Sequence, residues 1–352
     1  MRHLTSVVIT MATLSCSRPA APGAESTTLS ASSARSASQS LAERSAVVFS
    51  GTCDASGAVP LSSDRFAVAD DEDNVLRVYD ANRGGPPLWQ TDLSPELDLP
   101  IKEAKPGKKA KKAPETDIEA ATRIEDIALW LTSHGRNSSG KEKPERLRLF
   151  ATTAPVEQAN LQLVGQAQAH LLDAVLADPR YSTFGLSAAA ERAPKDPEGL
   201  NIEGMTARTE GGVWIGFRNP RPDGKALLLL LINPLAMVRE NAAPILGDPR
   251  LLDLGTLGIR SLSYWRGRYL IVAGHYSSGV ASRVFSWDGK SDRVIPLAES
   301  PEDLNPEGFF TPEERDQIML LSDDGARVIE GIECKKHKDI SKKSFRGVWW
   351  TP

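Results

Sequence analysis

The tetrapeptide Asn201-Ile202-Glu203-Gly204, followed by an apolar strand at 213–217, is one copy of a pattern that the chain repeats. Each copy has a short polar start, an apolar stretch, a turn, a second strand, a polar loop and a further strand. The third positions of successive copies are 47 to 84 residues apart. The other four starts are Asp54-Ala55-Ser56-Gly57, Asp117-Ile118-Glu119-Ala120, Gly258-Ile259-Arg260-Ser261 and Asn305-Pro306-Glu307-Gly308.

Repeats of roughly 40–50 residues with about four strands each are typical of a β-propeller. The sequence therefore predicts an all-β fold, with one propeller domain over residues 44–352 and five recognisable repeats. The longest gap or the chain ends could supply another blade, so we expect five or six blades. We expect Val47-Val48-Phe49 to close the ring beside the last blade. A β-sandwich or several small domains are the alternatives.

The longer gaps between repeats require insertions. Residues 101–114 are rich in lysine and form the first insertion. Residues 166–177 have helical periodicity and end at Asp178-Pro179, which predicts a short helical insertion.

The N-terminus resembles an export signal. Residues 1–16 combine a cationic start, a short apolar run and small residues. Cys16 lies where a bacterial lipoprotein is cleaved and acylated, and residues 17–43, rich in Ser and Ala, predict a disordered tether. We expect an exported protein of the cell envelope or periplasm, held by a lipid on Cys16. The alternative is a disordered cytoplasmic start with a chance cysteine.

Two further cysteines, Cys53 and Cys334, lie near the two ends of the predicted propeller. In an oxidising compartment they could pair and close nearly the whole ring. Two separate buried thiols are equally compatible with the sequence, because spacing along a chain does not establish geometry.

Composition excludes several classes of protein. Lys and Arg number 42 against 46 Asp and Glu, giving a net charge of −4, so a nucleic-acid partner is not expected. No apolar run approaches the roughly 20 residues that span a bilayer, so we expect membrane contact only through the N-terminal lipid. The sequence has no nucleotide-binding glycine motif, paired-cysteine zinc spacing or nucleophile elbow. We expect a monomer.

In a propeller, the start of each innermost strand and the end of the second strand lie on the same face. This geometry predicts one polar mouth of the central channel. Its candidate metal ligands are Asp54, Glu119, Glu203 and Glu307. Its candidate ligand-binding residues are Asp70, Asp71, Arg136, Arg218, Arg260, Asp323 and Asp324, and its candidate proton carriers are His134 and His275.

Clustered carboxylates repel one another unless a cation, a shared proton or an arginine compensates them. A hard cation such as calcium prefers an oxygen-rich site of this kind, whereas arginines suit a phosphate or carboxylate. Each residue also has a structural interpretation, as a turn residue or as a brace between blades. No cofactor is certain, and calcium is the cation that we favour.

Several of these blocks resemble a known family. The blocks are Cys53-Asp54-Ala55-Ser56-Gly57, residues 69–79, Asp117-Ile118-Glu119, residues 133–137, Asn201-Ile202-Glu203-Gly204, residues 216–220, Gly258-Ile259-Arg260 and residues 321–325. Together they resemble an uncharacterised bacterial family, domain of unknown function 3616, which is similar in style to the phytase-like, esterase-like propellers. The resemblance covers residues 45–327 and implies a propeller, but no activity.

Two functions are compatible with these observations. The first is a propeller that binds a small anionic or polar ligand, or an envelope protein, at one face of its channel. The second is a metal-dependent hydrolase of the phosphoesterase or lactonase class that uses the same face.

Overall fold

The computed structural model describes residues 45–99, 113–155, 160–276 and 280–352. They belong to one compact unit, Gln39–Pro352. The predicted export signal and tether, and most of the lysine-rich insertion, lie outside the described residues. In the part of the chain that is described, no helix is long and apolar enough to cross a membrane.

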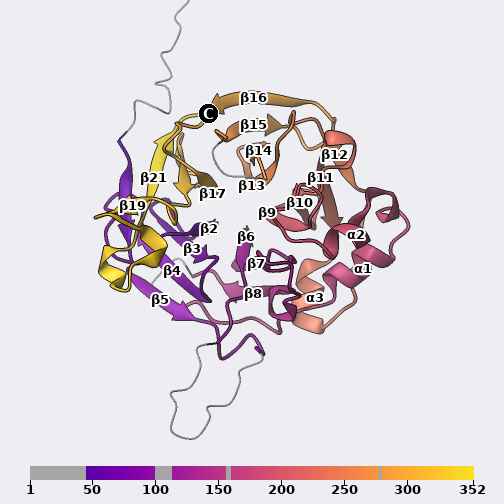
Figure 1. The fold of residues 1–352 in the computed structure, drawn as a ribbon, viewed down its shortest axis with the longest axis horizontal. Helices are drawn as coiled ribbons and strands as arrows, with labels where there is room; N and C mark the ends of the chain where they lie inside the picture. The colour runs from indigo at the N-terminus through magenta and orange to yellow at the C-terminus, as the bar shows by residue number, and fades with distance from the viewer. Residues whose placement is uncertain (1–44, 100–112, 156–159, 277–279) are drawn as a thin grey trace, which may run out of the picture. The chain divides into compact units, whose positions relative to one another are not determined.

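Five antiparallel sheets surround a common centre, which makes the fold a five-bladed β-propeller (Figure 1). The first blade consists of β2 (Ala55–Pro60), β3 (Arg65–Asp70), β4 (Val75–Asp80) and β5 (Trp89–Asp92). The second consists of β6 (Ile118–Ile124), β7 (Ile127–Thr132) and β8 (Leu149–Thr153). The third consists of β9 (Asn201–Ala207), β10 (Val213–Asn219), β11 (Ala226–Leu231) and β12 (Arg250–Leu252). The fourth consists of β13 (Gly258–Trp265), β14 (Arg268–Gly274), β15 (Arg283–Trp287) and β16 (Val294–Glu299).

The fifth blade joins the two ends of the propeller. Its strands are β17 (Pro306–Phe310), β18 (Ile318–Ser322), β21 (Ser344–Trp350) and β1 (Val47–Ser50). The N-terminal strand β1 pairs antiparallel with β21, with Phe49 opposite Phe345. The predicted ring closure by residues 47–49 is therefore confirmed. Closure also accounts for β1, so the described residues form five blades and no sixth.

The blades pack face to face, and this determines which strands are buried. The second strand β7 is buried at all six positions, because a neighbouring blade covers each of its faces. The outermost strand β16 is buried at none of its positions. Within the described residues, five apolar clusters lie between neighbouring blades, one at each interface, including the interface between the fifth and first blades. The core is thus continuous around the ring.

The longest gap between repeats contains an insertion and not a sixth blade. It holds α1 (Leu171–Ala177), η3 (Ser182–Phe184) and α2 (Leu186–Ala190), whose apolar residues join the cluster between the second and third blades. The predicted helix at 166–177 therefore begins about five residues too early. Gln168 instead exchanges backbone hydrogen bonds with Leu149 of β8, at 2.7 and 2.9 Å, and extends the second blade.

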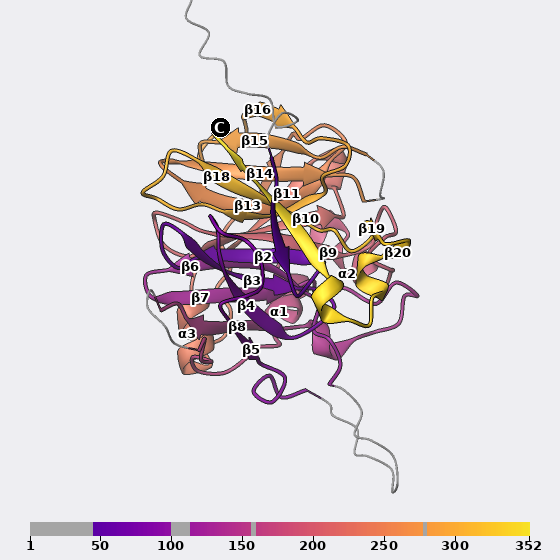
Figure 2. The same ribbon diagram turned by 90° about the vertical axis from the view of Figure 1, so that its left-hand side faces the viewer.

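Other short elements lie in loops. They are η2 (Pro144–Arg146), η4 (Pro222–Gly224) and α3 (Pro234–Glu240). Between β18 and β21 the chain leaves the fifth blade and forms β19 (Val328–Ile329), β20 (Ile332–Glu333), η5 (Cys334–Lys336) and η6 (Ile340–Lys342). We call residues 327–343 the C-terminal excursion. Figure 2 shows its yellow turns beside β20, at the start of the yellow strand β21.

Candidate functional site

A β-bulge at the start of each innermost strand displaces one or two residues from the regular pairing. In β6 the register passes from Ile118 opposite Thr132 to Ala120 opposite Leu131, which leaves Glu119 without a partner. The same irregularity occurs at Glu203, Arg260 and Glu307. The third position of the sequence repeat is thus the bulged residue, and a bulge re-aims its side chain.

The bulged side chains of neighbouring blades meet in one ion network. Arg218 of β10 donates to Glu203 Oε1 at 2.6 Å. Arg260 forms an ion pair with the other oxygen of Glu203 at 3.5 Å and a second one with Glu307. Arg218 also donates to the carbonyl oxygen of His275 at 3.0 Å. Protein groups therefore already compensate both guanidinium groups.

A surplus of carboxylates lies beside this network. One oxygen each of Asp71, Asp117 and Glu119 lies within 4.8 Å of the others. Glu119 is only 8% exposed. Burial, followed by the charges of Glu203 and Asp117, holds the pKa of Glu119 well above its ordinary range. Burial and the charge of Glu119 raise the pKa of Asp71 in the same way. We call Asp71, Asp117 and Glu119 the acidic triad.

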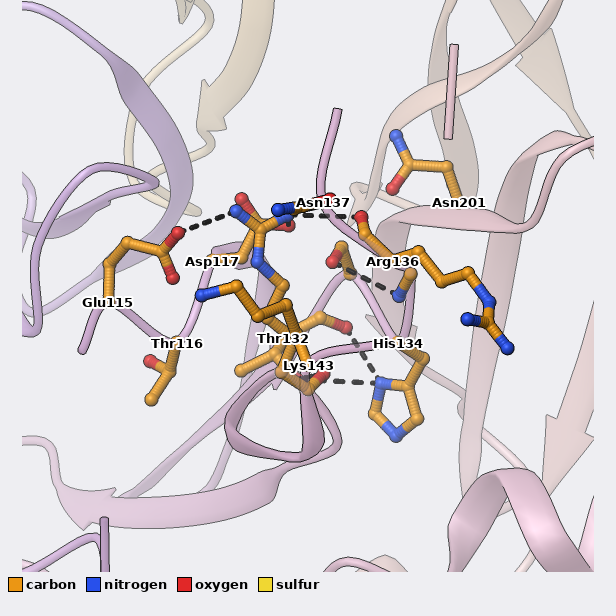
Figure 3. Close-up of polar contacts among 12 residues, drawn as sticks. Glu115, Thr116, Asp117, Thr132, His134, Arg136, Asn137, Lys143 and Asn201 are labelled. Carbon is orange, nitrogen blue, oxygen red and sulfur yellow. Dashed lines mark hydrogen bonds and ion pairs between the residues drawn. The ribbon is translucent and has the colours of Figure 1, made fainter. Parts of the chain in front are cut away.

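In the described part of the chain, Asp117 has a cationic partner, whereas Asp71 has an oxygen atom without a hydrogen-bond partner. Arg146 donates to Asp117 at 2.7 Å and to Glu115 at 2.6 Å (Figure 3). Burial nevertheless raises the pKa of Asp117 to about 6. The Oδ1 atom of Asp71 is buried and has no hydrogen-bond partner among the described residues. Asp71 is the member of the triad with an unsatisfied acceptor atom, which costs free energy when no cation compensates it.

A second group of carboxylates shares Asp71 with the triad. Asp54, Asp71 and Glu72 also offer oxygens within 4.8 Å of one another. Burial, then the charges of Asp323 and Asp70, raises the pKa of Asp54 to about 8. Lys335 opposes this effect, and its Nζ lies 3.2 Å from Glu72. The mouth is therefore acidic on two sides of Asp71.

A disulfide positions the lysine of this second group. Cys53 and Cys334 are bonded to each other, with their Cα atoms 6.0 Å apart. Asp54 follows one cysteine and Lys335 follows the other. The disulfide thus keeps the Lys335 segment beside the Asp54 carboxyl group.

Side chains of the innermost strands line a small cavity in the channel. A cavity of about 10 Å³, the size of one water molecule, remains between the five innermost strands. Ala58, Ala121, Met205, Leu262 and Phe309 are among its lining residues.

Three predicted ligand-binding residues have structural partners. Asp70 accepts hydrogen bonds from the backbone amide of Glu72 at 2.8 Å and from the hydroxyl group of Thr52. Asp324 accepts two hydrogen bonds from Arg346 of β21, each 2.8 Å long. Asp324 therefore secures the outer part of its own blade. Asp323 also accepts hydrogen bonds, from the backbone amide of Gly325 at 2.8 Å and from the side-chain amide of Asn305 at 3.1 Å. It lies near Asp54, and burial raises its pKa.

Arg136 is not brought into the acidic triad. Its guanidinium group donates to the backbone oxygens of Ala190 at 2.9 Å and Gly140 at 3.2 Å. Figure 3 shows the Arg136 side chain pointing away from Asp117. The reason is the turn after β7, whose positive φ at His134 redirects the chain toward α2.

The two histidines have different surroundings. The His134 ring is 2% exposed, its Nδ1 lies 2.8 Å from the backbone oxygen of Thr132, and burial lowers its pKa to about 4. Figure 3 shows this ring apart from the Asp117 carboxylate. The ring of His275 packs on Tyr276, with centroids 4.1 Å apart, and its carbonyl group holds Arg218. Neither contact places an imidazole in the acidic triad.

Sequence reasoning missed Asp117, Glu72 and Lys335 as site residues. Asp117 occupies the same position of the repeat as Asp54, so the alignment of the repeats could have found it. Glu72 stands in the acidic turn after β3, next to two residues that were predicted. Lys335 has no such signal, because it reaches the mouth through the disulfide and the excursion.

A larger concavity is lined by none of the predicted site residues. It is a groove of about 660 Å³ between α2 and the turn after β10. Phe184, Arg192, Pro220 and Arg221 are among its lining residues.

No protein-family description matches this chain, and no curated protein sequence matches it. The resemblance to domain of unknown function 3616 therefore stays a prediction. Among solved structures, the chain is similar to glutaminyl cyclase from Myxococcus xanthus, with 12% identity, 88% of this chain and 95% of the other covered, and a TM-score of 0.45.

Two further solved structures are similar at the same distant level. Aldose sugar dehydrogenase from Streptomyces coelicolor is 11% identical over 87% of this chain and 98% of the other, with a TM-score of 0.40. Exo-β-1,3-galactanase from Phanerochaete chrysosporium is 10% identical over 87% of this chain and 62% of the other, with a TM-score of 0.42. No activity is carried over from these likenesses.

Proposed function

We propose that the protein is an exported β-propeller that binds a divalent cation at its channel mouth and, through that cation, a small anionic or polar ligand. The observation that carries the proposal is the acidic triad. Asp71, Asp117 and Glu119 bring three carboxylate oxygens within 4.8 Å of one another. Two of these side chains are held by burial and like charges at a pKa far above the ordinary range.

The charge balance favours a cation over direct binding of an anion by arginine. Glu203 and Glu307 already compensate Arg218 and Arg260. Within the residues that the structure describes, Glu119 and Asp71 remain without a cationic side chain that is paired with them. Calcium takes six to eight oxygen ligands in a flexible geometry, and it would relieve this repulsion. The remaining positions of its coordination shell would be available to a ligand that carries oxygen atoms.

The ion network gives the triad a fixed frame. Glu203 is held by Arg218, by Arg260 and by the side-chain amide of Asn201, which donates to it at 2.7 Å. The charge of Glu203 is the largest charge effect on Glu119. We therefore assign Glu203 and the arginines to positioning, and Glu119, Asp71 and Asp117 to cation binding.

The cellular location is part of the same proposal. The disulfide between Cys53 and Cys334 supports an oxidising compartment. This agrees with the export signal and the lipid acceptor Cys16 that the sequence predicts. The chain would then be a tethered envelope protein of the domain of unknown function 3616 family, and its ligand could be an envelope protein that presents an anionic group.

One observation favours the hydrolase alternative. Asp54 shares Asp71 with the triad and has a pKa of about 8 when no cation is bound. A carboxyl group that keeps its proton near neutral pH can serve as a general acid. If Asp54 is the general acid of the hydrolase, neither His134 nor His275 is needed as a proton carrier. Turnover of a phosphoester or lactone that requires calcium and disappears in Asp54→Asn would support it.

The test is thermal melting of the chelator-treated protein with calcium, magnesium, manganese or zinc. A cation at 100 times its dissociation constant adds about 2.7 kcal/mol, which corresponds to a rise of roughly 5 °C in Tm. We expect calcium to raise the Tm of the natural chain, and Glu119→Gln to lose most of this rise. Glu240→Gln, at an exposed position of α3, is the matched control and should respond like the natural chain. The proposal fails if no cation changes the Tm.

A further inference from the structure

We propose that the C-terminal excursion, residues 327–343, is a docking surface for the anionic headgroups of a phospholipid membrane. The excursion lies outside the blades, since it leaves the fifth sheet after β18 and returns to it at β21. Its strands β19 and β20 pair only with each other. This proposal rests on the proposed export and lipid anchor, which would bring the protein to a membrane.

Exposed aliphatic side chains are concentrated on the excursion. Val328, Ile332 and Ile340 are 65%, 47% and 55% exposed. None of the three belongs to any of the five apolar clusters of the described chain. Aliphatic groups that fill no core and stand on a projecting segment are suited to insertion at a lipid interface.

The excursion is also basic, although the whole chain is acidic. It carries six cationic side chains against three acidic ones, whereas the whole chain has a net charge of −4. The exposed lysines include Lys336, Lys338 and Lys342. The pairs of Lys336 with Glu333 and Lys342 with Glu330 are exposed, and such pairs are weak in water. A basic patch with exposed aliphatic groups is complementary to an anionic bilayer surface.

The excursion is rigid enough to present these side chains together. The disulfide fixes it at Cys334. His337 lies in hydrogen-bond contact with the backbone oxygen of Ile329 at 2.9 Å, and Arg327 donates to the side-chain oxygen of Ser344 at 2.7 Å. A preorganised surface loses less conformational entropy when it binds.

The excursion lies at the C-terminal end of the short strand β1. Lys343 accepts a backbone hydrogen bond from Gly51, directly after β1, at 2.9 Å. The described chain begins at Ser45, two residues before β1. In β1, Val47 lies opposite Gly347 and Ser50 lies opposite Ser344, so the excursion is at the other end of this four-residue strand from Ser45. A lipid chain and a basic patch together give stable membrane binding where one alone is weak.

The test uses the full chain with Cys16→Ser, which cannot be acylated, so that the patch is measured apart from the lipid. Binding to vesicles of three parts phosphatidylcholine to one part phosphatidylglycerol is compared with binding to phosphatidylcholine alone. We expect a preference for the anionic vesicles that salt weakens. The triple variant Lys336→Gln, Lys338→Gln and Lys342→Gln should lower the partition coefficient at least about tenfold, since each lysine contributes about 1 kcal/mol.

A second variant tests the aliphatic groups. Val328→Ser with Ile332→Ser and Ile340→Ser should weaken binding to a similar extent, whereas Ile245→Ser with Ile295→Ser, at exposed positions elsewhere, should not. An unchanged Tm and calcium response would show that the variants fold and keep the mouth intact. Equal binding by all variants, or no preference for anionic vesicles, overturns the proposal. Acylation of Cys16 is measured separately by mass, so failure of the anchor is distinguishable from failure of the patch.

Discussion

At the scale of single residues, the mouth is dominated by carboxyl groups that would be ionised in water. Asp54 has a pKa of about 8 and Asp70 one of about 7, and burial is the first cause for both. In the unfolded chain such groups titrate near 3.8. The folded protein therefore binds protons that the unfolded chain has already released, and this difference makes stability depend on pH.

The cation-free protein should become less stable as pH rises from about 6.5 to about 8. Because the folded pKa values are raised, their contribution is complete below the unfolded pKa and is lost as pH rises through the folded pKa. Burial lowers the pKa of His134 from 6.5 to about 4, so the effect of His134 on stability has the opposite sign. This effect falls between pH 4 and 6.5 and therefore lies outside the range from pH 6.5 to 8. The expected loss is about 2 kcal/mol, measured by calorimetry with a chelator present.

Asp54→Asn provides the control for this pH dependence. An amide has no proton to release in this range, so the variant should show a clearly flatter decline of Tm with pH. Saturating calcium should flatten the profile of the natural chain as well, because the cation compensates the ionised carboxylates. A natural chain whose Tm is constant over this range would contradict the raised pKa values.

At the scale of elements, the innermost strands approach one another too closely for a side chain at some positions. The fourth residue of the repeat is Gly57, Ala120, Gly204, Ser261 or Gly308. A Cβ atom on Gly308 would lie 2.5 Å from the backbone oxygen of Ser56, in the neighbouring blade. The pattern of small residues in the sequence thus reflects the narrow centre of a five-bladed ring.

Gly308→Ala should destabilise the propeller by about 1–3 kcal/mol, because the added methyl group meets backbone atoms that cannot move independently. Ser261→Ala is the matched control, since this position already has a Cβ atom, and it should change stability by less than about 1 kcal/mol. Urea denaturation of both variants measures the difference. If the two variants are equally stable, the close approach of β17 and β2 is not a constraint.

At the scale of the whole molecule, the ring is closed twice near the same place. β1 pairs with β21, and Cys53, three residues after β1, is bonded to Cys334 across 281 positions of sequence. The strand pairing lies within the fifth blade, and the disulfide joins the residue before Asp54 to the C-terminal excursion. Of the two links, only the disulfide is covalent, so only the disulfide restricts the unfolded chain over almost the whole propeller.

Replacement of both cysteines, Cys53→Ser with Cys334→Ser, should lower stability by about 2–4 kcal/mol, corresponding to roughly 4–7 °C in Tm. Reducing agent should have the same effect on the natural chain and none on the double variant. Melting curves with and without reductant make the comparison. A reduced natural chain that melts like the oxidised one would show that strand pairing alone closes the ring.

The sequence by itself determined the architecture, because the polar starts and apolar strands recur in a fixed order and only a ring of sheets buries such repeats on every side. It also determined which positions gather at the mouth, as Glu119, Glu203, Arg260 and Glu307 show. The tertiary structure decided which of them are compensated. Arg136 finds backbone partners in its own loop and in α2, and Asp324 finds Arg346 in its own blade, whereas the described contacts give Glu119 and Asp71 Oδ1 no such partner. Lys335 joins them through a disulfide that sequence spacing could not establish. Charge compensation depends on distances of a few ångströms between blades, and a periodic pattern carries no information at that scale.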